Sequence, residues 1–164
     1  MSSINISNYQ KSDWKQLLEM VYQTMDYHMS IQNPVRFESY TDGLISNYCR
    51  SIVAKHRLKK GKLLVAHLDN KLVGFIYGYI DHQDKEMKKS AVKSGTISEL
   101  FVQQEARGKK VGKLLMAEIE KYMVDHSCRL IRLSEVHQTN NSARKFYQYL
   151  GYQPRTIEYA KRVN

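Results

Sequence analysis

The stretch that decides the fold is Gln104-Glu105-Ala106-Arg107-Gly108-Lys109-Lys110-Val111-Gly112-Lys113-Leu114-Leu115. Directly before it, the apolar run Ile97-Ser98-Glu99-Leu100-Phe101-Val102 is rich in residues that favour β-strands. After it, apolar side chains recur at steps of three and four, the period of an α-helix, at Val111, Leu114, Leu115, Ile119, Tyr122 and Met123. The sequence therefore predicts a strand, a loop rich in glycine and lysine, and a helix.

The charges of this loop favour an anionic ligand. Arg107, Lys109, Lys110 and Lys113 gather at the start of the predicted helix, where the helix dipole disfavours cations. Backbone N–H groups at a helix start can bind a phosphate, which would offset these charges. The alternative is a solvated basic turn in front of an ordinary helix.

Two common phosphate-binding motifs are absent from the sequence. Leu114 follows Gly112-Lys113, so the hydroxyl that a nucleotide P-loop directs at Mg²⁺ is missing. The dinucleotide pattern Gly-x-Gly-x-x-Gly does not occur either. A phosphate bound here would need a loop of another kind.

Length and composition fit one domain over residues 1–164, with 42% hydrophobic residues. No apolar run is long enough to span a bilayer, and residues 1–5 lack the pattern of a signal peptide, so we expect a cytoplasmic protein without a membrane partner. Cys49 and Cys128 form no CxxC pair, and the six histidines show no metal spacing. We therefore expect reduced, packed thiols and no metal site.

The formal net charge of +10 would attract a polyanion such as nucleic acid, an acidic membrane or a phosphorylated cofactor. The lysines and arginines are spread over the whole chain, however, as is typical of a solvated surface. The charge supports phosphate binding only weakly, and we do not expect a nucleic-acid partner.

The rest of the chain alternates between segments with the pattern of strands and segments with the period of helices. Strands are predicted at 4–6, 62–68, 71–80, 97–102, 129–136 and 157–163, and Asp69-Asn70 suits a two-residue hairpin. Helices are predicted from a cap at Ser12 or Asp13 to the break at Asn33-Pro34, over 41–58, from the basic loop to about 126, and over 142–150 before Gly151. The lysine-rich segment 81–94 is predicted to be a loop.

This order favours an α/β domain with a central sheet and helices on both faces. The strand, helix and strand between 97 and 136 should form a parallel crossover. The loop in that crossover would then lie at one end of the sheet.

Two segments of the chain resemble the signatures of one family. Arg107-Gly108-Lys109-Lys110-Val111-Gly112 is similar to the pyrophosphate loop of the GNAT superfamily of N-acetyltransferases, Gln/Arg-x-x-Gly-x-Gly/Ala. Lys110 stands where the first glycine is usual, and a lysine does not freely adopt a positive φ. Residues 140–152, Asn-Asn-Ser-Ala-Arg-Lys-Phe-Tyr-Gln-Tyr-Leu-Gly-Tyr, resemble the later signature Asn-x-x-Ala-x-x-Phe-Tyr-x-x-x-Gly-Phe/Tyr.

The resemblance implies a GNAT-like acyl-CoA N-acyltransferase fold with a mixed, mostly antiparallel sheet. It implies transfer of an acetyl group from acetyl-CoA, as co-substrate, directly to a primary amine of a small molecule or protein, and it allows a homodimer. An irregularity in the strand before the loop would free backbone groups for the pantetheine arm. The implied cofactor-binding residues are Leu100, Phe101, Val102, Arg107, Gly108, Lys109, Lys110, Val111, Gly112, Lys113 and Asn140.

Two residues are candidates for the chemistry. Glu99 is a carboxylate inside an apolar strand, and burial would raise its pKa towards a value useful for a general base. It could equally face solvent or pair with a lysine. The resemblance assigns Tyr147 the role of general acid towards the sulfur of CoA, whereas its spacing from Ala143 and Leu150 also fits core packing beside Phe146.

The tyrosines of the first two predicted helices, Tyr22, Tyr27, Tyr40 and Tyr48, are expected in the core or at its rim, on the side where an acceptor would bind. A different class of function stays open: a non-catalytic module that senses acyl-CoA or binds nucleic acid. Steep salt dependence would indicate nucleic acid, and release of free thiol from acetyl-CoA would exclude a sensor.

Overall fold

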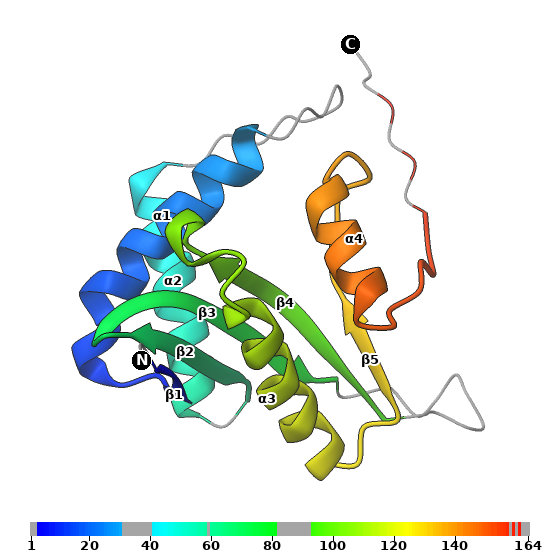
Figure 1. The fold of residues 1–164 in the computed structure, drawn as a ribbon, viewed down its shortest axis with the longest axis horizontal. Coiled ribbons are helices and arrows are strands. Elements are labelled where there is room, and N and C mark those ends of the chain that lie inside the picture. Colours follow the sequence, from blue (N-terminus) through cyan, green and yellow to red (C-terminus); the bar gives the residue numbers. More distant parts are fainter. Residues whose placement is uncertain are drawn as a thin grey trace.

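The computed structural model describes residues 3–30, 41–58, 60–81, 93–157, 159 and 161. Its centre is a five-stranded sheet in the order β1-β2-β3-β4-β5 (Figure 1). The pairs β1–β2, β2–β3 and β3–β4 are antiparallel and β4–β5 is parallel, which confirms the mixed, mostly antiparallel sheet and the parallel crossover. The strands are β1 (Ile4–Asn8), β2 (Lys62–Leu68), β3 (Lys71–Ile80), β4 (Ser94–Val102) and β5 (Leu130–Leu133).

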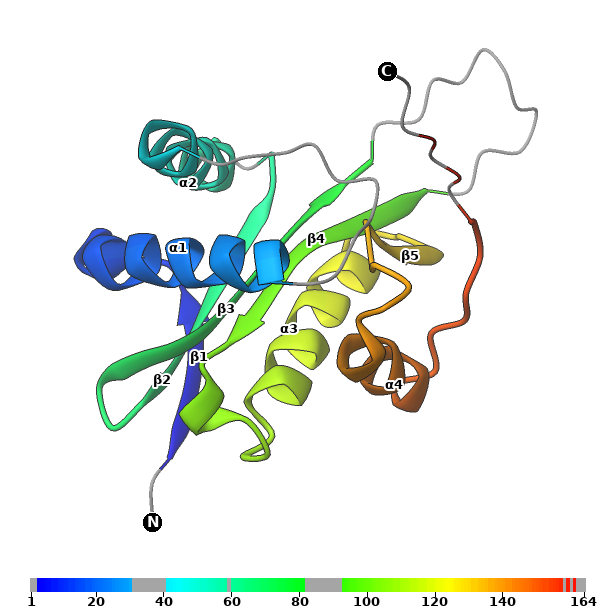
Figure 2. The ribbon, with the colours of Figure 1, turned by 90° about the horizontal axis from the view of Figure 1, so that it is seen from above.

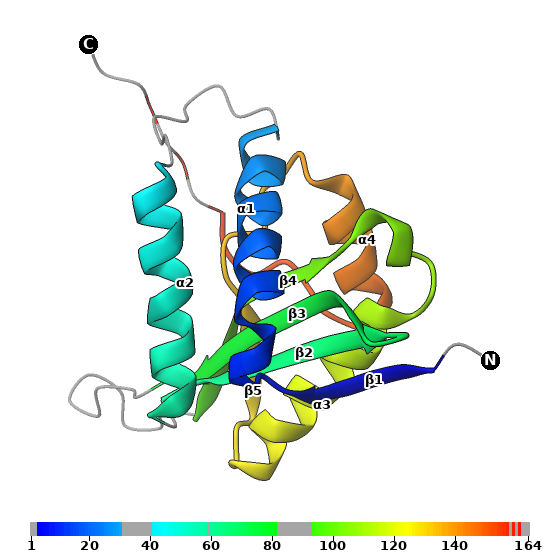
Figure 3. The same ribbon diagram turned by 90° about the vertical axis from the view of Figure 1, so that its left-hand side faces the viewer.

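Helices cover both faces of the sheet, as predicted. Helices α1 (Trp14–Ser30) and α2 (Asp42–Arg57) lie together on one face, and α3 (Val111–Asp125) lies on the other (Figures 2 and 3). Helix α4 (Asn141–Tyr149) packs through its apolar side chains against the α3 cluster. Short 3-10 turns, η1 (Lys11–Asp13) and η2 (Gln104–Ala106), precede α1 and α3.

Several local signals are confirmed. Asp69 and Asn70 have φ of 51° and 63°, the left-handed pair that a tight hairpin requires. Thr41 caps α2, since its hydroxyl accepts from the Leu44 N–H at 3.4 Å. Gly151 has φ of 91° and ends α4 as predicted.

Some predicted boundaries are wrong. The cap before α1 is Gln10, whose N–H donates to the Asp13 carboxylate at 2.7 Å, so the helical segment begins with η1. Strand β4 starts at Ser94 rather than Ile97, so residue 94 is not in the loop, while β5 is only four residues long. Most of the predicted strand 157–163, the Asn33-Pro34 break and most of the loop 81–94 lie outside the described residues, and Ile157, Tyr159 and Lys161 are not in a strand.

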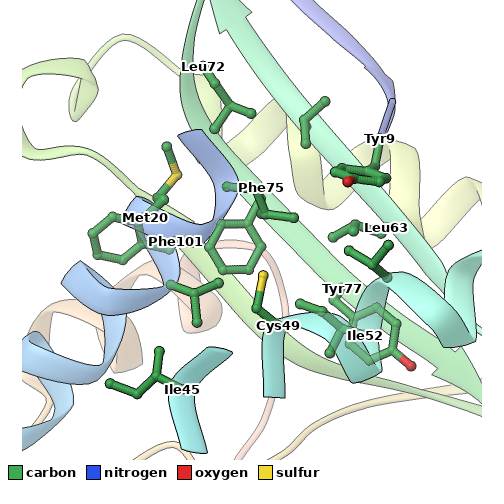
Figure 4. Close-up of a cluster of buried hydrophobic side chains, with 14 of the residues drawn as sticks. Tyr9, Met20, Ile45, Cys49, Ile52, Leu63, Leu72, Phe75, Tyr77 and Phe101 are labelled. Atoms are coloured by element: carbon green, nitrogen blue, oxygen red, sulfur yellow. The ribbon is translucent and has the colours of Figure 1, made fainter. Parts of the chain in front are cut away.

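The core consists of two clusters, one on each face. Side chains of α1, α2, β2, β3 and β4 form the first, in which Phe75 and Phe101 lie beside Cys49 and Met20 (Figure 4). The second is formed mainly by α3 against the opposite face of β2, β3 and β4. Each buried strand residue therefore belongs to one face of the sheet. The cluster to which a β4 side chain belongs shows which face it is on in the alternation of side chains along the strand.

That alternation reverses at a bulge in β4. Tyr77 pairs with Glu99 but its neighbour Gly78 pairs with Ile97, so Ser98 is an extra residue without a partner on β3. Ile97 and Phe101 are four residues apart, which would put them on one face of a regular strand. Instead Ile97 lies in the α3 cluster and Phe101 in the α1/α2 cluster.

The bulge determines which way Glu99 points. Because paired residues in a sheet share a face, Glu99 lies on the face of its partner Tyr77, beneath α1 and α2. Leu100, like its partner Ile76, lies on the α3 face. In a regular strand, with Ser98 paired to β3, Glu99 would point with Ile97 into the apolar α3 cluster.

Gly74 lets the first turns of α3 lie close to the sheet. A Cβ there would be 2.9 Å from the Phe101 carbonyl oxygen and 3.3 Å from side-chain carbons of Leu115 and Val111. We expect Gly74→Ala to lower the free energy of unfolding by about 1–3 kcal/mol, because the backbone contact cannot be relieved by a rotamer change. Chemical denaturation measures this.

Gly43 in α2 provides the matched control. A Cβ there meets nothing within 4 Å, so Gly43→Ala should raise stability by up to about 1 kcal/mol through helix propensity. If the two variants changed stability alike, the close packing of α3 on β3 would be wrong.

Candidate active site

The loop before α3 has the turn of a glycine loop although its sequence lacks one glycine. Lys110 has φ of 68° and ψ of 4°, the left-handed conformation that glycine adopts at low cost, and Gly108 has φ of 78°. Lys110 therefore takes the positive φ that a lysine does not freely adopt. The surrounding loop holds Lys110 in that conformation despite a cost of about 1–2 kcal/mol.

The start of α3 presents unpaired backbone donors. The first helical hydrogen bond runs from the Leu114 N–H to the Lys110 carbonyl at 3.0 Å, so the N–H groups of Val111, Gly112 and Lys113 precede it. The N-cap residue Lys110 makes no side-chain capping bond, and the first turn contains no acidic residue. These donors and the dipole of a 15-residue helix form a suitable anion site.

The basic side chains of the loop are exposed around this helix start, as predicted. The Arg107 guanidinium lies 5.5 Å from the centre of the Tyr27 ring, and its Nε donates to the Val102 carbonyl at 3.1 Å. The Lys113 ammonium lies 5.6 Å from the centre of the Tyr149 ring. The anion site is thus surrounded by cations and contacted by aromatic rings of α1 and α4.

Beyond the bulge, β4 separates from β5. Their pairing ends at Ile97 with Leu133, and the two strands diverge towards α4 (Figure 1). The Gln103 N–H donates to Val73 of β3 at 2.9 Å, so by antiparallel alternation the backbone groups of Phe101 and Glu99 also face β3. The N–H and C=O groups of Leu100 and Val102 therefore point to the side that β5 has left.

Asn140 caps α4. Its Oδ1 accepts from the Ala143 N–H at 3.1 Å and from the Tyr27 hydroxyl at 3.3 Å. The cap explains this residue structurally, so its predicted contact with a cofactor would involve the amide Nδ2. Tyr27 thus contacts both predicted cofactor segments, Arg107 in the loop and Asn140 before α4.

Glu99 is half-buried, and no lysine in the described part of the chain forms an ion pair with it. The Tyr48 hydroxyl, from α2, donates a hydrogen bond to Glu99 Oε1. Burial raises the pKa of Glu99 to about 7, the hydrogen bond from Tyr48 opposes this rise, and the charge of Glu135 adds to it. Both protonation states are therefore populated near neutral pH, which suits a general base.

Tyr147 lies in the same site. Its ring lies 5.4 Å from the Phe146 ring and 6.1 Å from the Tyr152 ring, measured between centroids. Tyr147 therefore does pack beside Phe146, as its spacing in the sequence predicts. Burial and then the charge of Glu99 raise the pKa of Tyr147 to about 12. The phenol consequently stays protonated at neutral pH, because the Glu99 carboxylate disfavours its ionised form.

Other candidate groups give no second site. Cys49 and Cys128 are buried free thiols whose pKa burial raises, to about 11 for Cys49, which does not favour a nucleophile. Within the described ranges, no three His, Cys, Asp or Glu side chains are grouped as metal ligands. In the same part of the chain, no helix has the length and apolar character needed to cross a membrane.

Sequence reasoning did not find the partner of Glu99. The sequence predicts Tyr48 only in the core or on the acceptor side, and Tyr48 lies 51 positions from Glu99. No local pattern connects the two residues, because the contact depends on the bulge and on the seating of α2. The same is true of Tyr27 with Asn140, which are 113 positions apart.

Comparisons with known proteins identify the family of this chain. The acetyltransferase (GNAT) family model matches residues 22–152. An uncharacterized N-acetyltransferase of Methanocaldococcus jannaschii is 34% identical over 57% of this chain and 53% of its own length. Another, of Archaeoglobus fulgidus, is 31% identical over 63% of this chain and 65% of its own length. The matched region thus spans about half to two thirds of these relatives.

Solved structures show the same fold. The aminoglycoside N-acetyltransferase AAC(6')-Iy, crystallised with CoA, superposes with a TM-score of 0.74 at 20% identity, covering 99% of this chain and 97% of that one. Because the family model covers most of the chain, this protein belongs to the GNAT acetyltransferase family. The resemblance of its two motifs is thereby confirmed.

Replacing Lys110 tests the strained loop. Lys110→Gly and Lys110→Ala remove the same charge, but alanine keeps the left-handed strain and glycine does not. We expect the glycine variant to be about 1 kcal/mol more stable than the alanine variant, measured by chemical denaturation. Equal stability, or a more stable alanine variant, would mean that residue 110 is not left-handed.

Proposed function

We propose that this protein is an N-acetyltransferase that moves an acetyl group from acetyl-CoA directly to a primary amine. The observation that carries the proposal is the single site formed by the donor-lined start of α3, the free backbone edge of β4 and the pair Glu99 and Tyr147. The solved relative AAC(6')-Iy, which binds CoA, supports this reading of the fold.

The two backbone features would hold acetyl-CoA at both ends. The N–H groups of Val111, Gly112 and Lys113 bind the pyrophosphate, and the exposed cations of the loop offset its charge. The pantetheine arm extends along β4, where Leu100 and Val102 offer backbone donors and acceptors. Arg107 leaves the Val102 carbonyl when the arm binds there.

Glu99 would prepare the acceptor. An alkylammonium has a pKa near ~10 and cannot attack a carbonyl until it loses a proton. Glu99 takes that proton, and the neutral amine attacks the thioester carbon. A backbone N–H of β4, at Leu100 or Val102, stabilises the oxyanion that forms.

Tyr147 would complete the transfer. As the carbon–sulfur bond breaks, the phenol gives its proton to the thiolate, and it regains a proton from the nitrogen of the new amide. The products are the N-acetylated amine and CoA with a free thiol, and the one excess proton leaves through Glu99. No covalent enzyme intermediate is needed, because holding both substrates together lowers the barrier.

The acceptor would enter from the side of α1 and α2, because the bulge turns Glu99 to that face. The other predicted wall, segment 81–94, lies mostly outside the described residues. A cytoplasmic location fits a reaction that uses acetyl-CoA, and a homodimer remains part of the proposal.

Thiol release from acetyl-CoA with a panel of primary amines tests the function. Gly112→Val serves as the binding-defective control, since a Cβ at Gly112 already lies 3.3 Å from Phe146 and a larger side chain crowds the donors. Amine-dependent release by the wild type, lost in this variant, supports the proposal. Binding of acetyl-CoA without release for any amine would indicate a sensor instead.

The pH dependence of kcat/KM should reveal the ionisation of Glu99. In the wild type the rate rises with pH with a midpoint near 7, because Glu99 acts only when ionised. Glu99→Gln removes this midpoint and leaves only the rise towards the pKa of the amine, near ~10. If the glutamine variant kept the midpoint near 7, another group would be the base.

Tyr147→Phe keeps the ring contacts with Phe146 and Tyr152 and removes the hydroxyl. We expect unchanged stability and acetyl-CoA affinity with kcat lower by about 10²–10⁴, the usual effect of losing an acid–base group. Turnover at saturating amine measures this. A wild-type rate would reduce Tyr147 to a packing residue.

A further inference from the structure

Tyr48 contacts Glu99 from the helix layer that covers the same face of the sheet. Its helix α2 is seated by buried Ile45, Cys49 and Ile52, and its phenol donates to Glu99 Oε1 on β4. Burial raises the pKa of Tyr48, and the charge of Glu99 raises it further, so this hydroxyl stays protonated and acts as a permanent donor. The contact joins the helix layer to the strand that carries the base.

The carboxylate needs such a partner because of where it lies. Ser98 bulges out of the ladder with β3, so Glu99 follows an irregular piece of backbone, and its side chain has free rotations of its own. A hydrogen bond from Tyr48 fixes one carboxylate oxygen and leaves the other for the incoming ammonium.

We propose that Tyr48 is a positioning residue for Glu99, an inference that rests on the proposed acetyl transfer. Tyr48 holds the carboxylate on the α1/α2 face and keeps it ionised, but it exchanges no proton with the substrates. None of the sequence motifs includes it.

The groups around Glu99 determine whether its pKa rises or falls when the Tyr48 hydroxyl is removed. Besides Tyr48 from α2, they are Tyr77 across the ladder on β3, Tyr147 from α4 and Glu135 after β5. Burial and Glu135 raise the pKa of Glu99, and the Tyr48 hydrogen bond lowers it. Removing Tyr48's hydroxyl alone should therefore raise this pKa, because its donor stabilises only the ionised form.

Tyr48→Phe keeps the ring in the core. We expect the acid limb of kcat/KM to move up by about one pH unit, with rates about tenfold lower below that limb and nearly unchanged at high pH. A purely structural role would lower the rate by the same factor at every pH, and that result would overturn the proposal.

Tyr22→Phe is the matched control. Tyr22 also joins α1 to α2, since its hydroxyl donates to the Asp42 carbonyl at 3.1 Å and lies 3.2 Å from Ser46 Oγ, but it does not contact Glu99. Its variant should keep the wild-type pH profile. The same shift in both variants would mean that the packing of α1 on α2, and not the hydroxyl of Tyr48, determines the midpoint of the acid limb.

Site-specific 3-fluorotyrosine at position 48 tests the opposite direction. Its phenol is more acidic and donates more strongly, so the acid limb should move to lower pH, and an unmoved limb would contradict the proposal. NMR titration of the Glu99 carboxyl, assigned with Glu99→Gln, separates this inference from the proposed function. An unshifted Glu99 in Tyr48→Phe refutes the role of Tyr48, whereas a shifted Glu99 without acetyl transfer by the wild type refutes the reaction alone.

Discussion

The bulge at Ser98 is the feature on which the rest of the site depends. One extra residue in β4 reverses the side-chain alternation, so that Ile97 packs against α3 and Phe101 against α1 and α2. It turns Glu99 away from an apolar cluster, where a carboxylate would be costly, towards Tyr48. From the same point β5 no longer pairs with β4, which leaves the outward backbone groups of Leu100 and Val102 without a strand partner.

The position of the α3 helix start, the other part of the site, depends on how closely α3 packs on the sheet. Gly74 allows α3 to lie close to β3, and the left-handed Lys110 directs the chain from the loop into the helix. The unpaired donors of α3 thus come to the same end of the sheet as the free edge of β4. In the proposed mechanism, backbone groups bind the cofactor and side chains from three layers carry out the chemistry.

Local signals in the sequence predicted most of the fold. The hairpin at Asp69-Asn70, the basic loop before α3 and the helix stop at Gly151 each depend on neighbouring residues, and each is confirmed. Long-range contacts were not predictable, because Tyr48 and Glu99 meet only after the sheet and α2 have packed. Lys110 shows the limit of propensity, since its loop imposes a conformation that lysine alone disfavours.

The central claim is that acetyl-CoA lies along the free edge of β4 with its pyrophosphate on the start of α3. Amide NMR spectra recorded during a titration with CoA test it most directly. We predict large, saturable shifts for the N–H groups of Leu100, Val102 and residues 111–113, with little change in β1 at the far edge of the sheet. Shifts centred instead on the polar hollow lined by Gln10, Asp13 and His67 would contradict the account.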